Sequence, residues 1–337
     1  MEYVNVALDA MGGDNAPLET VKGAVEALNE NDNIRIYLTG PEDVLNKELS
    51  TYSYDKERLV IKHAPSIIET DEPPVLAIKK KKDSSIVVGL NLVKDGTCDA
   101  FVSAGSTGAI LVGGQLVAGR IKGVERAPLA PLIPTKAGMT LLIDCGANVD
   151  ARASHLVQFA KMGSIYMEHI VGVKEPRVGI LNIGAEEEKG NQLVKETFPL
   201  LKNCPDINFI GSVEARDVPY GAADVVVCEA FSGNVLLKTY EGVGGVLISE
   251  VKRGLMTTFV SKIGALLIKK ALKKTLKKFT ADEYGGAPLL GLKGLVVKTH
   301  GNSTSKEIKN SIKQCIAFKK ERISERISEK INLDIMG

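Results

Sequence analysis

The sequence predicts an α/β protein in which a mostly parallel sheet carries helices on both faces. A short apolar, β-branched run, then a turn of Gly, Ser, Asn or Asp, then a longer helical segment, recurs along the chain. The apolar runs are continuous rather than alternating, which is typical of strands buried on both faces. Glycine is abundant, with 33 residues in 337, and this indicates many tight backbone turns.

The units follow one another in order. Residues 4–10 form the first expected strand and lead into MGGDNAP, where Asn15 is placed to cap a helix and Pro17 to occupy its first turn. The later strands, each with the turn that follows it, are 99–104 before GSTGA, 141–145 before GANVDA, 177–183 before GAEEEKGN, 223–230 before FSGN and 294–300 before GNSTS. Isoleucines at helical spacing in 304–331 then predict one amphipathic helix or a pair.

These turns are expected to gather at one sheet edge, because parallel strands share the edge at which they end. Helix N-termini there present free N–H groups and a partial positive charge, so the turns together favour a small anionic ligand. None has the GxGxxG or the GxxxxGK[ST] spacing of nucleotide-binding loops. Closest in character to a phosphate loop is SAGSTGA, with the hydroxyls of Ser106 and Thr107 between Gly105 and Gly108.

Length and composition limit the class of protein. The 337 residues suit one large domain or two lobes, and we expect a single α/β catalytic unit over 1–337. Forty-four per cent apolar residues and a net charge of +2 indicate a globular protein without a nucleic-acid partner. The start of the sequence reads as a strand rather than a signal peptide, and the longest uncharged stretch, 100–119, is too rich in glycine for a membrane span, so we expect a soluble protein.

The cysteines and histidines predict neither disulfides nor a metal site. Five cysteines form no CxxC pair, and with four scattered histidines they offer no metal-site spacing. Unpaired cysteines suit the cytoplasm.

Positive charge is concentrated in residues 251–281, which contain nine Lys and Arg and no acidic residue, while the rest of the chain has a net charge of −7. Apolar residues that include Leu255 and Phe259 recur at helical spacing, and a second apolar set faces away from Lys269, Lys270, Lys273 and Lys274. A basic amphipathic helix is typical of docking to an anionic membrane or an acidic protein. The alternative is a solvated helix face over an ordinary apolar stripe.

The sequence gives little support for catalysis by a side-chain nucleophile. No string has the GxSxG pattern of serine hydrolases. Cys145 and Cys228 stand at strand ends, but we expect both to be buried, structural thiols. Metal catalysis would need a cluster, for which Asp9, Asp14, Asp144 and Glu229 are candidates at strand ends.

Inorganic phosphate is itself a nucleophile, so the remaining chemistry requires only groups that hold it and polarise an electrophile. N–H and hydroxyl donors are available in Gly105–Gly108, a cation in Lys189, an amide in Asn234 and an imidazole in His300. A single histidine at a strand end is more often a satisfied hydrogen-bonding group than a catalyst. Lys189 at a helix start needs a compensating anion, because a cation there opposes the helix dipole.

Longer strings resemble those of the bacterial phosphate acyltransferase family, in order and over nearly the whole chain. The strings are ALDAMGGDNAP (7–17), DEPPVLAIKKKKDSS (71–85), FVSAGSTGA (101–109), LIDCGAN (142–148), PRVGILNIGAEEEKGN (176–191) and EYGGAPLLGLKGLVVKTHGNS (283–303). The resemblance implies transfer of a fatty acyl group from an acyl carrier protein thioester to inorganic phosphate, in phospholipid synthesis. It also implies a fold like those of phosphate acetyltransferase and isopropylmalate dehydrogenase.

The resemblance further implies a homodimer, no metal or nicotinamide cofactor, and peripheral attachment to an anionic membrane, where a membrane acyltransferase passes the acyl group to glycerol 3-phosphate. Acyl carrier protein is acidic, so basic residues near the site would speed its encounter. The protein is therefore expected in the cytoplasm, at the membrane surface, with residues 251–281 docking to the membrane or the carrier protein.

On this resemblance, site roles can be assigned. Phosphate is expected against Gly105, Ser106, Thr107, Gly108, Ser232 and Gly233, and substrate against Asp9, Gly12, Gly13, Asp14, Asn148, Asn302 and Ser303. Lys189 would neutralise phosphate charge, Asn234 would hold phosphate or the thioester oxygen, and His300 would donate a proton to the thiolate or orient a neighbour.

The family pattern DGFTGN stands here as EAFSGN, and GNVEGRD as GSVEARD. Ala230 would strain the backbone if its φ had to be positive.

The sequence leaves two alternative functions open. A dehydrogenase of the isopropylmalate type would need a metal-binding Asp cluster and a nicotinamide pocket. A non-enzymatic scaffold at the membrane surface would use the basic segment alone.

Overall fold

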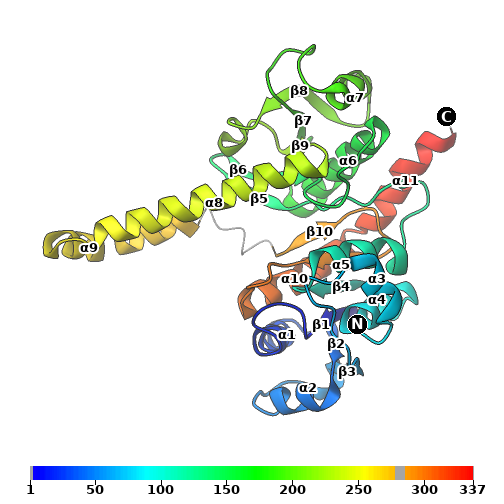
Figure 1. The fold of residues 1–337 in the computed structure, drawn as a ribbon, viewed down its shortest axis with the longest axis vertical. Coiled ribbons are helices and arrows are strands. Elements are labelled where there is room, and N and C mark those ends of the chain that lie inside the picture. The colour runs from blue at the N-terminus through cyan, green and yellow to red at the C-terminus, as the bar shows by residue number, and fades with distance from the viewer. Residues whose placement is uncertain (1–2, 278–284, 337) are drawn as a thin grey trace.

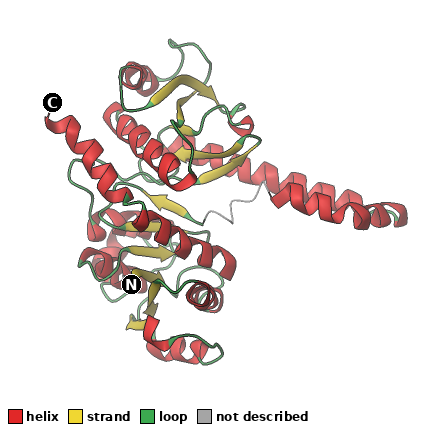
Figure 2. Ribbon diagram, turned by 180° about the vertical axis from the view of Figure 1, so that it is seen from behind, coloured by secondary structure: helices red, strands yellow, loops and turns green. Residues whose placement is uncertain are grey.

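The computed structural model describes residues 3–277 and 285–336, in two sheets surrounded by helices (Figures 1 and 2). The first sheet has, in spatial order, β10 (Ala287–Leu289), β11 (Leu295–Lys298), β4 (Ala100–Ser103), β1 (Val4–Asp9), β2 (Ile34–Gly40) and β3 (Leu59–His63). The second has β5 (Leu132–Thr135), β6 (Gly138–Ile143), β9 (Val225–Val227), β7 (Arg177–Asn182) and β8 (Asn208–Glu214). Among the strand pairs of the described residues, only the edge pairs β10–β11 and β5–β6 are antiparallel. The predicted α/β class is therefore confirmed.

Helices cover both faces of each sheet. Those around the first sheet are α1 (Leu18–Glu30), α2 (Glu42–Leu49), α3 (Pro74–Lys80), α4 (Ser85–Lys94), α5 (Thr107–Gly113) and α10 (Ser305–Lys320). Those around the second are α6 (Ala153–Tyr166), α7 (Gln192–Lys202) and the start of α8 (Ala230–Leu255). Alternate residues of a strand face opposite sides: Ile143 of β6 packs in the cluster that contains Phe159 of α6, while Leu142 packs in the cluster with Leu237 of α8.

The expected single sheet is wrong, although each expected strand is present. After β4 and α5 the chain leaves the first sheet, builds β5–β9 as a second sheet, and returns through β10 and β11. The turns therefore divide three and three, after β1, β4 and β11 in one sheet and after β6, β7 and β9 in the other. Strand pairing over such distances depends on tertiary contacts, which local apolar runs do not encode.

One apolar core nevertheless connects the two sheets. A continuous cluster of buried side chains includes Leu8 of β1, Ile312 of α10, Tyr166 of α6 and Val178 of β7. The hydroxyl of Tyr166 accepts a hydrogen bond from Nε2 of Gln314 at 2.7 Å, which ties α6 to α10. The C-terminal segment, for which the sequence predicted one amphipathic helix or a pair, is a pair of helices, α10 and α11 (Ile323–Met336).

Asn15 does not cap α1. That helix begins at Leu18 with Pro17 at its N-cap and no side-chain cap, because the Asn15 amide donates instead to the carbonyls of Asn302 and Ser303, at 3.1 and 3.3 Å.

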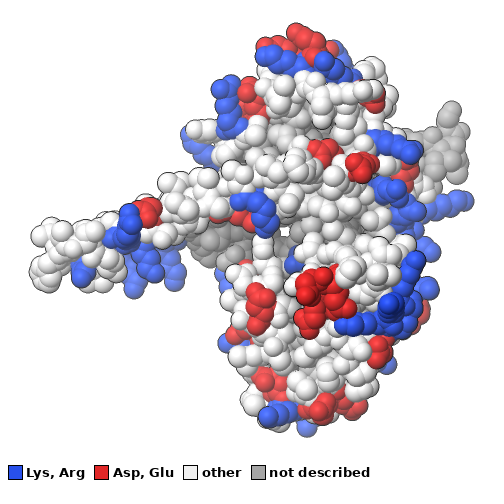
Figure 3. Space-filling view, viewed as in Figure 1, with Lys and Arg blue, Asp and Glu red and all other residues white. Residues whose placement is uncertain are grey.

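The predicted basic segment 251–281 is not one helix. It covers the end of α8, a break at Met256–Thr258, and α9 (Phe259–Lys277), which folds back along α8; residues 278–281 lie outside the described residues. The two helices project from the body as a hairpin (Figures 1 and 2). Its apolar side chains are open in a single chain, with Phe259 78% and Leu267 79% exposed. On the face drawn in Figure 3 the hairpin is mostly uncharged, with basic side chains along its lower edge.

No helix in the described part of the chain is long and apolar enough to cross a membrane.

Candidate functional site

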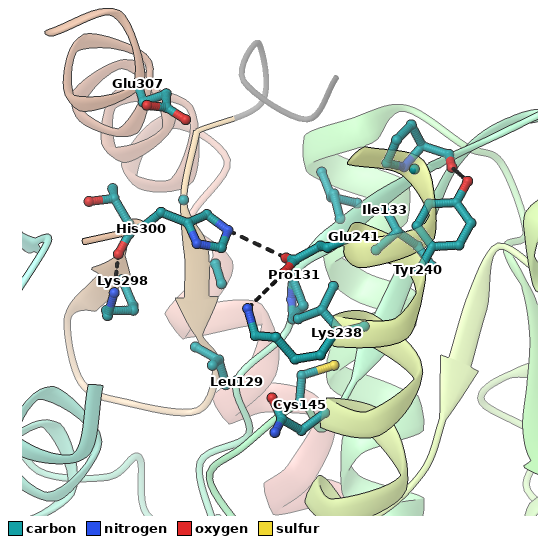
Figure 4. Close-up of a pocket in the computed structure, with 18 of the residues that line it drawn as sticks. Leu129, Pro131, Ile133, Cys145, Lys238, Tyr240, Glu241, Lys298, His300 and Glu307 are labelled. Atoms are coloured by element: carbon teal, nitrogen blue, oxygen red, sulfur yellow. Dashed lines mark hydrogen bonds and ion pairs between the residues drawn. The ribbon is translucent and has the colours of Figure 1, made fainter. Parts of the chain in front are cut away.

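A cavity of about 850 Å³ lies between the two sheets, bounded by α8, the loop before β5, and β11 with the loop that follows it (Figure 4). Its apolar wall includes Leu129, Pro131, Ile133, Leu237 and Leu247. Its polar lining is Thr107, Asn234, Lys238, Glu241, Lys298, Thr299, His300, Ser303, Glu307 and Ser311. A concave, mostly apolar space with a few convergent polar groups is typical of a site for a small organic ligand.

Three ionisable side chains meet across the cavity. On α8 the i,i+3 spacing brings Lys238 Nζ within 2.7 Å of Glu241 Oε2. From the other sheet, His300 Nε2 lies 3.4 Å from Glu241 Oε1, as the dashed lines in Figure 4 mark. Burial opposes ionisation of Glu241, but the hydrogen bonds from His300 and Lys238 outweigh it and lower the pKa of this carboxyl.

Lys298 is a half-buried cation at the end of β11 and faces the same cavity. Its ammonium donates a hydrogen bond to the carbonyl of Thr299. Burial, together with the positive charge of Lys238, lowers the pKa of Lys298 to about 8, against a smaller opposing effect of Asp14. Sequence reasoning missed this residue; the available signal was a lysine that directly ends a buried apolar strand.

Ser303 adds an unsatisfied group. Its side chain lines the cavity and only 4% of the residue is exposed, yet its Oγ has no hydrogen-bond partner among the residues that the structure describes. A buried hydroxyl without a partner is rare in folded proteins and is accounted for when a ligand supplies the missing bond.

The three turns of the first sheet are bonded to one another. Buried Ser103 Oγ donates to Asp9 Oδ2 at 2.6 Å and accepts from the Gly105 amide at 3.0 Å. The Asp14 amide donates to the Gly301 carbonyl at 2.7 Å. Burial raises the pKa of Asp9, against the hydrogen bonds that it accepts.

Some of these turn residues have packing constraints of their own. A Cβ on Gly12 would come within 2.6 Å of the Gly105 nitrogen, so the two turns touch only because residue 12 has no side chain. Ser106 is buried and caps α5 by accepting from the Ala109 amide at 3.4 Å, and Gly108 packs against Pro74.

In the second sheet the turn after β6 is organised around a buried carboxylate. Asp144 accepts from the amides of Leu129, Gly146, Ala147 and Asn148, at 2.8–3.2 Å, and from Asn148 Nδ2 at 2.7 Å. Burial raises its pKa, against these bonds. Asn148 thereby anchors the turn, and its carbonyl accepts from the Ala230 amide.

The start of α8 is already capped by the protein itself. Glu229 accepts from the amides of Phe231 and Ser232, at 2.6 and 3.0 Å, and from the Ser232 hydroxyl. Gly233 packs against the Asp144 carbonyl. Ala230 is the first residue of α8 and is not among the residues with positive φ, so it causes no strain there.

Of the residues predicted from sequence, the structure brings Thr107, Asn234, His300 and Ser303 to the cavity. Lys189 is elsewhere: it follows β7, is exposed, and its ammonium lies 2.8 Å from Glu186, which raises its pKa. The predicted residues that do not line the cavity are Asp9, Gly12, Gly13, Asp14, Gly105, Ser106, Gly108, Asn148, Lys189, Ser232, Gly233 and Asn302.

Both strand-end thiols are buried, as expected. Cys145 lines the cavity and Cys228 lies behind it, and burial raises the pKa of each well above the ordinary value for a thiol. Asp9, Asp14, Asp144 and Glu229 occupy separate hydrogen-bonded settings. Among the residues that the structure describes, no group of three or more His, Cys, Asp and Glu side chains is arranged to hold a metal ion.

Comparison with known proteins gives consistent results. A family model described as "Fatty acid synthesis protein" matches residues 4–326. A phosphate acyltransferase of Clostridium perfringens is 51% identical over 328 residues, 97% of each chain, and one of Clostridium beijerinckii is 50% identical over 316 residues, 94% of this chain and 95% of the relative. These relatives bear the name of the family that the sequence strings resemble.

Among solved structures, a phosphotransacetylase from Streptococcus pyogenes superposes with a TM-score of 0.63 and 17% identity, over 94% of this chain and 93% of that one. A phosphotransacetylase from Staphylococcus aureus gives a TM-score of 0.61 and 16% identity, over 96% and 94%. At this identity the likeness concerns the fold, and the expected phosphate acetyltransferase-like fold is confirmed.

Proposed function

The chain belongs to the fatty acid synthesis protein family matched over residues 4–326, and from this premise we propose that it is a phosphate acyltransferase. It transfers a fatty acyl group from the thioester of acyl carrier protein to inorganic phosphate and releases acyl phosphate. Acyltransferase activity accords with the names of the relatives that are about half identical in sequence. The donor and the product are those that the resemblance of the sequence strings to this family implies.

The observation that carries this proposal is the shape of the cavity, which combines a long apolar wall with a charged end. Its lining follows α8 from Asn234 to Ile248, a length of about 21 Å at 1.5 Å per residue. A bilayer core about 30 Å thick holds two layers of acyl chains, so one chain spans about 15 Å. Lys238 and Glu241 lie within this length, so the apolar part of the α8 lining, from Glu241 to Ile248, is about 10 Å long. It is therefore long enough to cover a large part of a membrane-type acyl chain.

The polar end would hold the reacting groups. Phosphate bound there needs N–H or O–H donors and a cation, which Ser303, Thr107 and His300 supply together with neighbouring lysines. Asn234, the fifth residue of α8, lines the cavity and would donate its amide to the thioester oxygen, on which negative charge develops during attack. Lys189 has no part in this arrangement, because its ammonium is paired with Glu186 outside the cavity.

The proposal includes partners and location. Acyl carrier protein delivers the acyl group, and a membrane glycerol-3-phosphate acyltransferase consumes the product, which favours a cytoplasmic protein attached to the membrane surface. The open apolar and basic side chains of the α8–α9 hairpin suit an anionic membrane or a second subunit of a homodimer.

The test measures thiol release from acyl carrier protein thioester by the purified protein, with and without inorganic phosphate, and traps acyl phosphate with hydroxylamine. We expect release only with phosphate. Asn234→Ala should lower kcat by about 10²–10³-fold, the usual effect of losing one oxyanion donor. Thr239→Ala, on the same helix but outside the cavity lining, is the matched control. Equal thiol release without phosphate would exclude this function.

A further inference from the structure

The departing thiolate needs a proton, and the sequence offered His300 as one donor. In the structure the His300 imidazole lies 3.4 Å from Glu241 Oε1, and the proposed reaction uses it to bind phosphate. Lys238 and His300, at the charged end of the cavity, already share one carboxylate, because both contact Glu241, at 2.7 and 3.4 Å. Lys298 is different. Its ammonium donates to the Thr299 carbonyl, and it makes no ion pair with any residue that the structure describes. An ammonium has three N–H donors, so two remain for a ligand.

The backbone of Lys298 is held on both sides. β11 lies between β10 and β4, and Lys298 is paired with Ala287 on one side and with Ser103 on the other. Ser103 leads directly into the turn whose Thr107 lines the cavity. Lys298 is therefore a rigidly mounted cation between that turn and the charged cluster on α8. Figure 4 shows it across the cavity from Lys238 and Glu241.

We propose that Lys298 is the general acid that protonates the leaving thiolate, an inference that rests on the proposed acyl transfer. A phosphate oxygen attacks the acyl carbon and forms the new C–O bond; the C–S bond then breaks and its electron pair goes to sulfur. The Lys298 Nζ–H is transferred to that sulfur, and neutral Lys298 regains a proton from the hydrogen phosphate that has become acyl phosphate. Thioester and hydrogen phosphate thus give acyl phosphate and thiol, with no other reactant.

The acidity of Lys298 suits this step. An ordinary lysine has a pKa near 10.4 and an ordinary thiol near 8.5, whereas the pKa of Lys298 is about 8. Proton transfer is efficient when the pKa of the donor is close to that of the acceptor and to the working pH. The ionisable groups around Lys298 are Asp14 in the turn after β1, Lys238 and Glu241 on α8, His300 in its own turn, and Glu307 on α10.

The test compares wild type with Lys298→Arg and Lys298→Met, on an alkyl thioester and on an aryl thioester whose thiol is a strong acid. Arginine keeps the charge but does not release a proton, because its pKa exceeds 12. We expect both variants to lose about 10²-fold or more in kcat on the alkyl thioester and little on the aryl thioester, which leaves without a proton. Lys293→Arg, an exposed lysine just before β11, is the matched control.

The wild-type pH profile gives a second readout that needs no variant. The kcat on the alkyl thioester should fall as the pH rises above about 8, where Lys298 loses its proton, and this limb should be absent on the aryl thioester. Equal losses on both thioesters with a raised KM for phosphate, or a Lys298→Arg variant with wild-type kcat, would overturn the inference and leave the proposed function standing. Phosphate-independent cleavage by wild type would overturn both.

Discussion

Gly233 should be the least replaceable glycine of α8, because no side chain fits between this helix and the turn after β6. A Cβ at this position would lie 1.9 Å from the Asp144 carbonyl oxygen and 2.9 Å from Cys228 Sγ. The start of α8 would have to retreat by roughly 1.5 Å to restore an ordinary van der Waals contact. Overpacking of this kind costs about 1–3 kcal/mol, more than the 0.5–1 kcal/mol that alanine gains over glycine in a helix.

The same helix contains a matched control. No atom of the described residues lies within 4 Å of a Cβ on Gly242, so Gly242→Ala should stabilise the protein by up to about 1 kcal/mol. Gly233→Ala should lower the free energy of unfolding by about 1–2 kcal/mol, measured by urea denaturation. It should also lower activity by about 10²-fold, since a displacement of about 1 Å is enough to misplace reacting groups. If Gly233→Ala were as stable and as active as Gly242→Ala, the proposed contact between α8 and the turn would be refuted.

Two further outcomes are expected. Glu241→Gln should destabilise the protein more at pH 7 than at pH 3. The lowered pKa of Glu241 gives a stabilising contribution that is fully present above the ordinary glutamate pKa and decreases as the pH falls toward the lowered pKa. Urea unfolding at both pH values measures this, and an equal loss of stability at both would contradict it. Replacing Lys269, Lys270 and Lys273 with Glu should weaken binding to anionic vesicles in a flotation assay without changing binding to neutral ones. Unchanged binding to anionic vesicles would mean that these lysines are only a solvent-exposed helix face.

Local sequence patterns predicted the individual helices and strands but not how the strands assemble into sheets. The continuous apolar run at 4–10 predicted β1. The Lys-rich amphipathic pattern predicted helix over 251–281, of which the structure shows the end of α8 and α9 at Phe259–Lys277. The break at Met256–Thr258 was not predicted, because apolar residues at helical spacing continue through it. The division into two sheets was also missed, since a strand does not carry in its own residues the identity of its partner.

The residues of the candidate site were likewise predicted only in part. Asn234 and His300 were identified as chemically suitable and do line the cavity, whereas Lys189, identified for the same reason, is paired with Glu186 outside it. Lys298 was overlooked because its sequence context is that of any residue at the end of a strand. Its usefulness comes from burial and from the nearby charge of Lys238.

The amino-acid order by itself determined the fold class, the family and the kinds of group available for chemistry, because hydrophobic periodicity and turn composition act over a few residues. Tertiary structure alone decided which groups share a cavity and how readily each holds a proton. Those properties depend on solvent exclusion and on charges contributed by segments far apart in the chain, such as Glu241 on α8 and His300 after β11.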